Sequence, residues 1–496
     1  MVPPAWAQLD RPIGRFARLA SWIVVSIVFI GIIWWQGIPN EGDATFSLYT
    51  TWAIAHGHFA CAYPPLVTRG VQGSWAPVTY IAPLYPLLAG GISALLHLGS
   101  GVAFPSSGLM GPHCDAALRE MLLWALRADV ATATVRIGLI VWVAVLASTV
   151  AFLRAVGRGA TIWEPVTLFL LAISVPMLSA YFQYFHPQDV LALCCVLASL
   201  AALFNGRWLL AGIGMGAAIG ANQYALLAGV GLFVLMSRRA RWRFFLGVCV
   251  VTILLYAPFI IASGGRSWLL VAKGSGFNYS TGGTILWEMH LPSALMFAVS
   301  RFVPLGAAAL VAGVARRHVD VHHQLGVVSL VTTCLALRLV FEANLWSYYF
   351  IPLAAMLLIM DVVAGRFRGP VIAWLMAEAI AFNPFFHFIA PDHKLQGIWI
   401  AIYGPVVLTL VGALIVGLRL MRRRVSGEWI AFFIVAAGSL VIGERIPGIH
   451  LYWWPTWLWQ LVLVPSGVAL AAQPLLRSHR EALMSDGTPT GLATIT

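Results

Sequence analysis

The stretch from residue 11 to residue 43, RPIGRFARLASWIVVSIVFIGIIWWQGIPNEGD, places three arginines before a long apolar run and two carboxylates after it. The run from Leu19 to Ile38 is long enough to cross a bilayer, which takes about 20 apolar residues. An excess of arginine marks the cytoplasmic flank of a spanning helix. We therefore expect the N-terminus in the cytoplasm, and Glu41 and Asp43 on the extracytoplasmic side.

The composition excludes a soluble globular protein. Hydrophobic residues make up 60% of the chain, charged residues only 10%, and the mean hydropathy is +0.86. Soluble domains are nearer a quarter charged. The formal charge of +12 is no sign of nucleic acid here, because the basic residues cluster in short loops between apolar segments. The sequence thus predicts an all-α polytopic membrane protein with no nucleic-acid partner.

Further apolar segments follow along the chain, and most have the length of a spanning helix. The segment 208–236 has arginines at both ends, so we interpret it as a tight helical hairpin broken around Gly220 and Asn222. The bundle then has about 12 to 14 crossings, with arginine-rich turns inside and most acids outside. The segments are 136–155, 162–181, 189–204, 208–236, 243–262, 291–313, 325–342, 347–363, 369–390, 397–418, 428–444 and 455–473.

We expect one transmembrane domain over residues 1–475 and a cytoplasmic tail over 476–496. The loop 39–134 is longer than a turn between helices needs, and it contains two apolar stretches, Ala44–Gly57 and Val78–Leu98. If the second stretch crossed the membrane, every later arginine cluster would lie outside. The positive-inside rule therefore favours interfacial or re-entrant helices in this extracytoplasmic loop.

Polar chemistry on the outer face has no access to cytoplasmic nucleotide sugars, so a transferred group would arrive on a lipid. Three stretches carry a resemblance to a known family: EGDATFSLYTTWAIAHGHF with the following YPPL, YFHPQDVLALCCVLASLAALFNGRWLLAGIGMGAAIGANQYALL, and LRLVFEANLWSYYFIPLAAMLLIMD. Together they resemble the GT-C superfamily of membrane glycosyltransferases, and in particular its bacterial polyprenyl-phosphate-mannose-dependent members. The resemblance implies a GT-C-like bundle in the plasma (inner) membrane of a bacterium.

In that family the acid after the first helix acts as a base or positions the acceptor, and the matching residue is Asp43, with Glu41 beside it. The alternative is that Asp43 caps the helix expected from Ala44, since Asp suits that position. Phe46 stands where a capping box would place Glu or Gln. Both roles are compatible, and we expect Asp43 to be the general base.

Further candidates for binding donor phosphate or substrate lie in other outer segments. Each has a structural alternative: Asp189 is a natural helix cap, the glycine-rich loop around Arg266 is an ordinary solvated loop, and Arg338 pairs with Glu342 one helical turn away. Gln188 departs from the family pattern, in which an acid often follows the proline directly. The candidates are His186, Asp189, Arg266, Lys273, Arg338, Glu342, Tyr348 and Tyr349.

We expect no essential metal and no cofactor, because the histidines of the first outer loop, His56 and His58, lack ligand spacing on a helix. A bridge between Cys61 and Cys114 would fasten that loop in an oxidising compartment.

The predicted activity is transfer of a hexose or pentose, with mannose favoured, from a polyprenyl-phosphate donor to a glycolipid or glycan acceptor, with inversion. The alternative is a transporter or flippase of a lipid-linked saccharide. Glu378 is the only clear acid within a membrane segment, whereas transporters usually carry several and show related halves.

Overall fold

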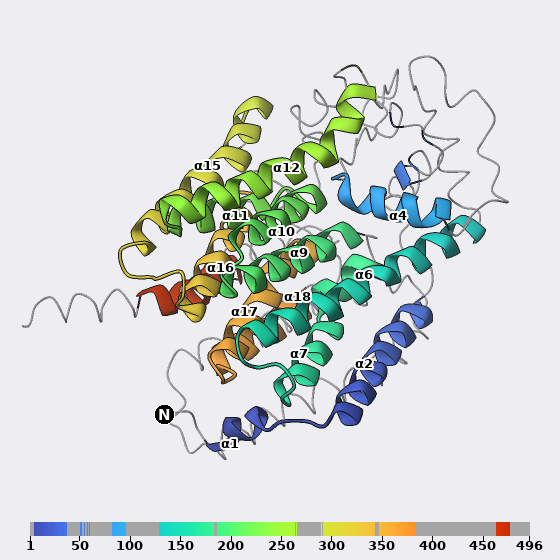
Figure 1. Ribbon diagram of the computed structural model, residues 1–496, viewed down its shortest axis with the longest axis vertical. Helices are drawn as coiled ribbons and strands as arrows, with labels where there is room; N and C mark the ends of the chain where they lie inside the picture. The colour runs from blue at the N-terminus through green and yellow to red at the C-terminus, as the bar shows by residue number, and fades with distance from the viewer. Residues whose placement is uncertain are drawn as a thin grey trace, which may run out of the picture.

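A computed structural model shows a bundle of α-helices (Figure 1), and the residues that it describes include no named strand. It describes residues 4–36, 82–95, 128–182, 186–262, 291–342, 347–381 and 463–476, with a few positions between 50 and 59 and the single residues 264 and 289. An all-helical chain was predicted, and this part of the prediction is confirmed.

The described helices follow one another along the chain with short connections. In order they are α1 (Pro4–Ala7), η1 (Gln8–Asp10), α2 (Arg15–Gln36), α4 (Leu84–Leu95), α6 (Ala128–Ala155), α7 (Trp163–Ala172), α8 (Val175–Phe182), α9 (Pro187–Phe204), α10 (Trp208–Ala221), α11 (Ala225–Leu235), α12 (Arg238–Ala262), α15 (Ser293–Ala315), α16 (Gln324–Val340), η3 (Ser347–Phe350), α17 (Ile351–Val363) and α18 (Gly369–Ala381), with a further helix over Leu463–Leu476.

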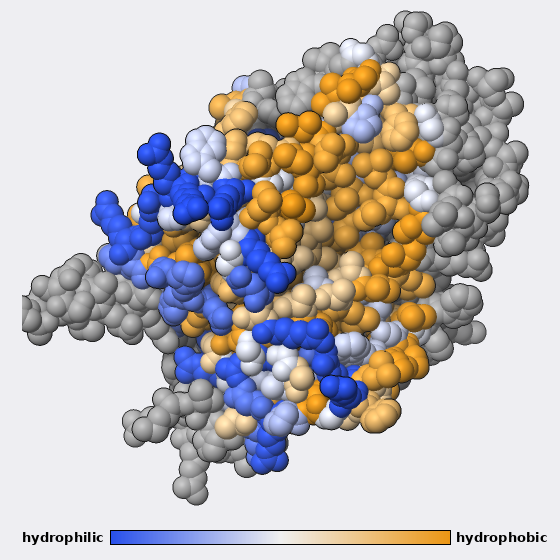
Figure 2. Space-filling view, in the orientation of Figure 1, coloured by the Kyte–Doolittle hydropathy of each residue, from blue (hydrophilic) through white to orange (hydrophobic). Residues whose placement is uncertain are grey.

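Four helices within the described residues are long and apolar enough to cross a membrane, and a bent pair brings the number to five. The four stretches are Arg15–Ile32, Pro187–Phe204, Arg238–Ala262 and Ala298–Ala315. Orange apolar side chains cover most of the visible face beside these helices (Figure 2). The chain is therefore a helical membrane protein, as its composition predicts.

Two breaks interrupt apolar segments of the sequence. The segment 162–181, expected as one helix, is two helices, α7 and α8, that meet at 51°. Pro176 lies in the first turn of α8, and proline disfavours helical backbone in the residue before it while removing one hydrogen bond. The second break, between α10 and α11, falls at Asn222, where the sequence predicts it.

One end of the bundle collects arginines and is called here the arginine-rich end. Arg18 at the start of α2 contacts Glu164 at the start of α7, and Arg158 after α6 forms an ion pair with Asp10. Hydrophilic residues gather on the left of Figure 2, at this end. Successive helices alternate in direction, so every second connection returns to it.

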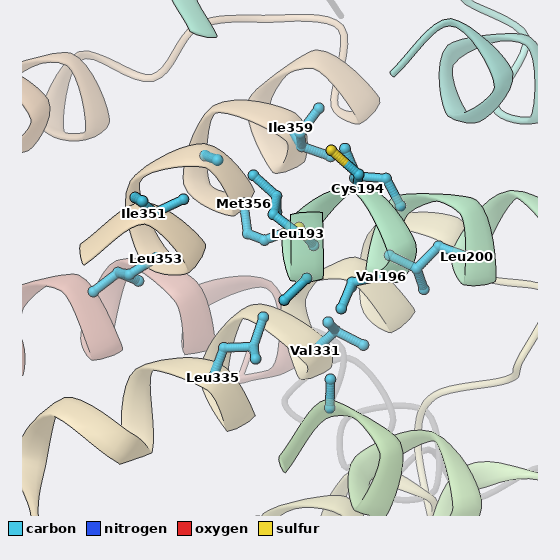
Figure 3. Close-up of a cluster of buried hydrophobic side chains, with 14 of the residues drawn as sticks. Leu193, Cys194, Val196, Leu200, Val331, Leu335, Ile351, Leu353, Met356 and Ile359 are labelled. Carbon is cyan, nitrogen blue, oxygen red and sulfur yellow. The ribbon is translucent and has the colours of Figure 1, made fainter. Parts of the chain in front are cut away.

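The core lies where α9, α16 and α17 meet (Figure 3). Leu193 and Val196 of α9, Leu335 of α16, and Met356 and Ile359 of α17 are each at most 3% exposed. Burial in a membrane bundle gives no hydrophobic gain between helices, so close packing stabilises these contacts. This central packing fixes where the far ends of the same helices meet.

Candidate functional site

Asp189 is held at the end of the bundle opposite the arginine-rich end. It is the third residue of α9, and the helix begins at Pro187, which suits a first position because its missing N–H has no helical partner there. The Asn222 side-chain amide donates to Asp189 Oδ1 at 2.7 Å, and the Tyr224 hydroxyl donates to the Asp189 carbonyl oxygen at 2.7 Å. The break between α10 and α11 thus grips the start of α9.

The expectation that Asp189 merely caps a helix is wrong. The N-cap position belongs to His186, and neither that residue nor any other forms a side-chain cap there. The Asp189 side chain is 1% exposed and is held by an amide from another helix pair. A buried carboxylate tied to a distant residue needs a different explanation from an exposed helix cap.

His186 joins the start of α9 to η3. Its ring stacks on Tyr348, with centroids 4.0 Å apart and planes 12° apart. Nδ1 lies 2.8 Å from Gln188 Nε2 and 3.6 Å from Asp189 Oδ2. If the Gln188 amide donates, the imidazole is neutral with its proton on Nε2. The departure of Gln188 from an acid therefore places an amide where it can set the histidine tautomer.

Arg338 enters the same cluster from the end of α16. Its Nε donates to Glu342 Oε2 at 2.8 Å, as the four-residue spacing predicts. Its guanidinium carbon also lies 4.2 Å from the Tyr349 ring centroid and 5.5 Å from the Tyr224 ring centroid. An arginine between two tyrosines is held in place by stacking as well as by its ion pair.

The cluster is buried, yet two of its polar atoms have no hydrogen-bond partner among the described residues. They are Asp189 Oδ2, an acceptor, and Arg338 Nη1, a donor. Unsatisfied buried polar atoms are costly and uncommon, so each one calls for an explanation. A ligand carrying both a hydroxyl and an anionic oxygen would satisfy the carboxylate and the guanidinium together.

The structure brings together most of the predicted site residues that it describes, and it leaves others undescribed. His186, Asp189, Arg338, Glu342, Tyr348 and Tyr349 come from three separate segments into one cluster. The remaining candidates lie outside the described residues, as does the proposed disulfide. These are Glu41, Asp43, Arg266, Lys273, Cys61 and Cys114.

Sequence reasoning missed two residues of the cluster, Asn222 and Tyr224, as direct partners of Asp189. Both stand in Asn222-Gln223-Tyr224, the only polar interruption of a long apolar segment. That signal located the helix break but not its contact. Polar residues inside a membrane segment usually face protein rather than lipid, which was the available clue.

The arginine-rich end contains a second set of buried ion pairs, and these connect helices to one another. Arg18 and Trp22 both donate to Glu164 Oε1, at 2.6 and 2.8 Å. Arg368 donates through Nε to Asp361 at 2.5 Å and through Nη1 to Gln473 at 3.1 Å. Each carboxylate here is matched to an arginine on a neighbouring segment, as expected for structural pairing.

No protein-family model and no curated protein sequence matches this chain. The function is therefore argued from the residues and their geometry.

Proposed function

We propose that this chain is an integral membrane glycosyltransferase. It moves a sugar, with mannose favoured, from a polyprenyl-phosphate donor to a hydroxyl of a glycolipid or glycan acceptor on the extracytoplasmic face. The observation that supports this proposal best is the buried cluster of Asp189, Arg338, His186 and Tyr348 at the end away from the arginines. Ionisable groups at membrane depth are expensive to bury and are functional by default.

The two unpartnered atoms match the two ends of a sugar phosphate. Arg338 Nη1 would donate to a phosphate oxygen, and Asp189 Oδ2 would accept from a sugar hydroxyl. The stacked pair of His186 and Tyr348 offers a flat aromatic surface of the kind that packs against a sugar ring. An aqueous metabolite would not need a bundle whose sides are apolar, whereas an isoprenoid tail would lie against them (Figure 2).

The proposed reaction is a single displacement. The acceptor oxygen forms a bond to the anomeric carbon as the bond from that carbon to the phosphate oxygen breaks. Polyprenyl phosphate leaves with the electron pair, and a carboxylate takes the acceptor proton. One displacement inverts the anomeric carbon. We assign the proton acceptor to Asp43, which precedes the first outer apolar stretch, and a positioned base contributes roughly 100 to 10,000-fold to rate.

A direct test uses purified protein in lipid nanodiscs with a panel of radiolabelled polyprenyl-phosphate sugars. We expect one donor to lose its label to an added acceptor extract, and Asp43→Asn to reduce that transfer by at least about 100-fold. Glu41→Gln is the matched control, because it makes the same chemical change two residues away. No transfer from any donor, or normal transfer by Asp43→Asn, would contradict the proposal.

The helix breaks favour a second candidate, a transporter of a lipid-linked saccharide. Transporters commonly use discontinuous helices, and here α7 meets α8 at 51° while α10 is interrupted at Asn222. Glu378 in α18 is 1% exposed, and its Oε1 has no hydrogen-bond partner within the described chain. Movement of a labelled lipid-linked saccharide across proteoliposomes, without chemical transfer of its sugar, would favour this alternative.

A further inference from the structure

The arginines at the arginine-rich end fall into two groups that differ in their neighbours. On the side of α2 and α7, Arg18 is paired with Glu164 and Arg158 with Asp10. On the side of α10 and α12, the chain contains no Asp or Glu at any position from 190 to 287. Orientation in the membrane requires positive charge at this end, but it does not explain why one side is neutralised and the other is not.

Four exposed arginines form the group without acids, called here the unpaired arginine patch. None of the four enters an ion pair within the described residues, whereas Arg241 beside them donates three hydrogen bonds to carbonyl oxygens at the end of α11. Arg241 therefore has a structural role that the others lack. The patch consists of Arg207, Arg238, Arg239 and Arg243.

Helix packing brings the members of the patch to one level. The α10 and α12 backbones touch, because a side chain at Gly212 would collide with the Phe244 carbonyl oxygen, and one at Gly247 would lie 2.6 Å from the Leu209 carbonyl oxygen. Since the two helices run in the same direction from this end, Arg207 before α10 lies at the level of the first turn of α12.

One face of α12 presents charge first and apolar surface afterwards. Arg239 and Arg243 are one turn apart and both exposed, with Trp242 between them at 64% exposure. Residues three or four apart share a helix face. The face continues with exposed apolar residues toward the other end of the helix, namely Leu246, Val250, Ile253 and Leu254.

We propose that this face of α12, with Arg207 beside it, binds an anionic phospholipid. The headgroup phosphate would lie among Arg207, Arg239 and Arg243, and an acyl chain would follow the apolar residues below them. Charge complementarity identifies the occupant, because several guanidinium groups without local carboxylates attract anions. A soluble anion would have no use for the exposed apolar surface that continues the same face. Trp242 sits where tryptophan commonly anchors, at the membrane interface.

Native mass spectrometry of the full chain tests the proposal with phosphatidylglycerol as the probe and phosphatidylcholine as the neutral comparison. Each arginine near an anionic surface changes affinity about fivefold. We expect Arg239→Gln/Arg243→Gln to weaken phosphatidylglycerol binding roughly 25-fold and to leave phosphatidylcholine binding unchanged. The control is Arg11→Gln/Arg15→Gln, which removes two exposed arginines at the same end, next to α2. The control should bind within about twofold of the original chain, because the acids on its side already weaken the local potential.

Equal loss in both variants would mean that total charge, not this face, attracts the lipid, and would overturn the proposal. So would binding of glycerol phosphate as tight as that of phosphatidylglycerol, since the site would then recognise a free phosphate. All four substituted side chains are exposed, and unchanged melting temperatures would show that both variants remain folded. The measurement does not depend on enzymatic activity, so its outcome is separate from that of the proposed transferase.

Discussion

At the residue scale, Asp189 depends on a partner 33 positions along the chain. Asn222 donates to one carboxylate oxygen of Asp189 and accepts from the Tyr224 backbone N–H at 3.3 Å with its own oxygen. One amide therefore shapes the helix break and orients the acid. We regard Asn222 as a positioning residue, because it acts on a substrate through Asp189.

Asn222→Ala should destabilise the protein, because it leaves a buried carboxylate oxygen without its donor. The expected loss in the free energy of unfolding is about 1–3 kcal/mol, measured by titration with SDS in mixed micelles. Asn205→Ala is the matched control: Asn205 donates a hydrogen bond of the same length, 2.7 Å, to the Ala201 carbonyl oxygen, but it is exposed. If both variants lost the same stability, the bond to Asp189 would have no special weight.

Arg338 and Glu342 permit a double-mutant cycle. Their side chains are 13% and 7% exposed, so removing one leaves the other charge largely buried. Arg338→Gln alone should cost about 3–5 kcal/mol of unfolding free energy. Adding Glu342→Gln should recover part of that loss, because both charges are then absent. A double variant as unstable as the sum of the two single variants would show that the ion pair contributes nothing.

At the element scale, the sequence predicted the helices well where membrane physics alone sets them. The predicted 243–262 became α12, and the hairpin 208–236 became α10 and α11 with its break at Asn222. Apolar length and flanking arginines were sufficient for these elements. The bend at Pro176 was missed because hydropathy is continuous across it, although the proline itself was visible.

The candidate site was harder to predict than the helices. The four-residue spacing predicted the pairing of Arg338 with Glu342, because that contact lies within one helical turn. The contacts of Asp189 with Asn222, and of His186 with Tyr348, join residues from different segments. Such contacts depend on how the helices pack, and a single sequence does not encode them in any local spacing.

The close approach of α10 and α12 leads to a prediction about glycine. Gly212→Ala would drive a methyl group into the Phe244 carbonyl oxygen, and backbone cannot move as a side chain can. We expect a loss of about 1–3 kcal/mol in unfolding free energy. Gly31→Ala in α2 is the control, since nothing lies within 4 Å of its added Cβ. That variant should be neutral or gain up to about 1 kcal/mol from helix propensity. Equal stability of the two variants would contradict the close packing.

At the scale of the whole molecule, the bundle has two chemically different ends. One contains exposed arginines and the structural pairs of Glu164 and Asp361. The other contains the cluster around Asp189, whose unpartnered atoms are suited to a ligand. The proposed use of a lipid-linked donor requires that these ends face opposite sides of the membrane, with the arginines in the cytoplasm.

This sidedness can be measured with single cysteines in a chain whose six native cysteines are replaced. Ser237 is exposed just before α12, at the arginine-rich end, and Met289 is 59% exposed in the connection between α12 and α15, at the other end. Since α12 is long enough to cross the membrane, the two positions should lie on opposite sides. A membrane-impermeant maleimide added to intact cells should label Met289→Cys but label Ser237→Cys only after permeabilisation. The reverse pattern would place the Asp189 cluster at the cytoplasmic surface, where nucleotide sugars are available, and the argument for a lipid-linked donor would lose its basis.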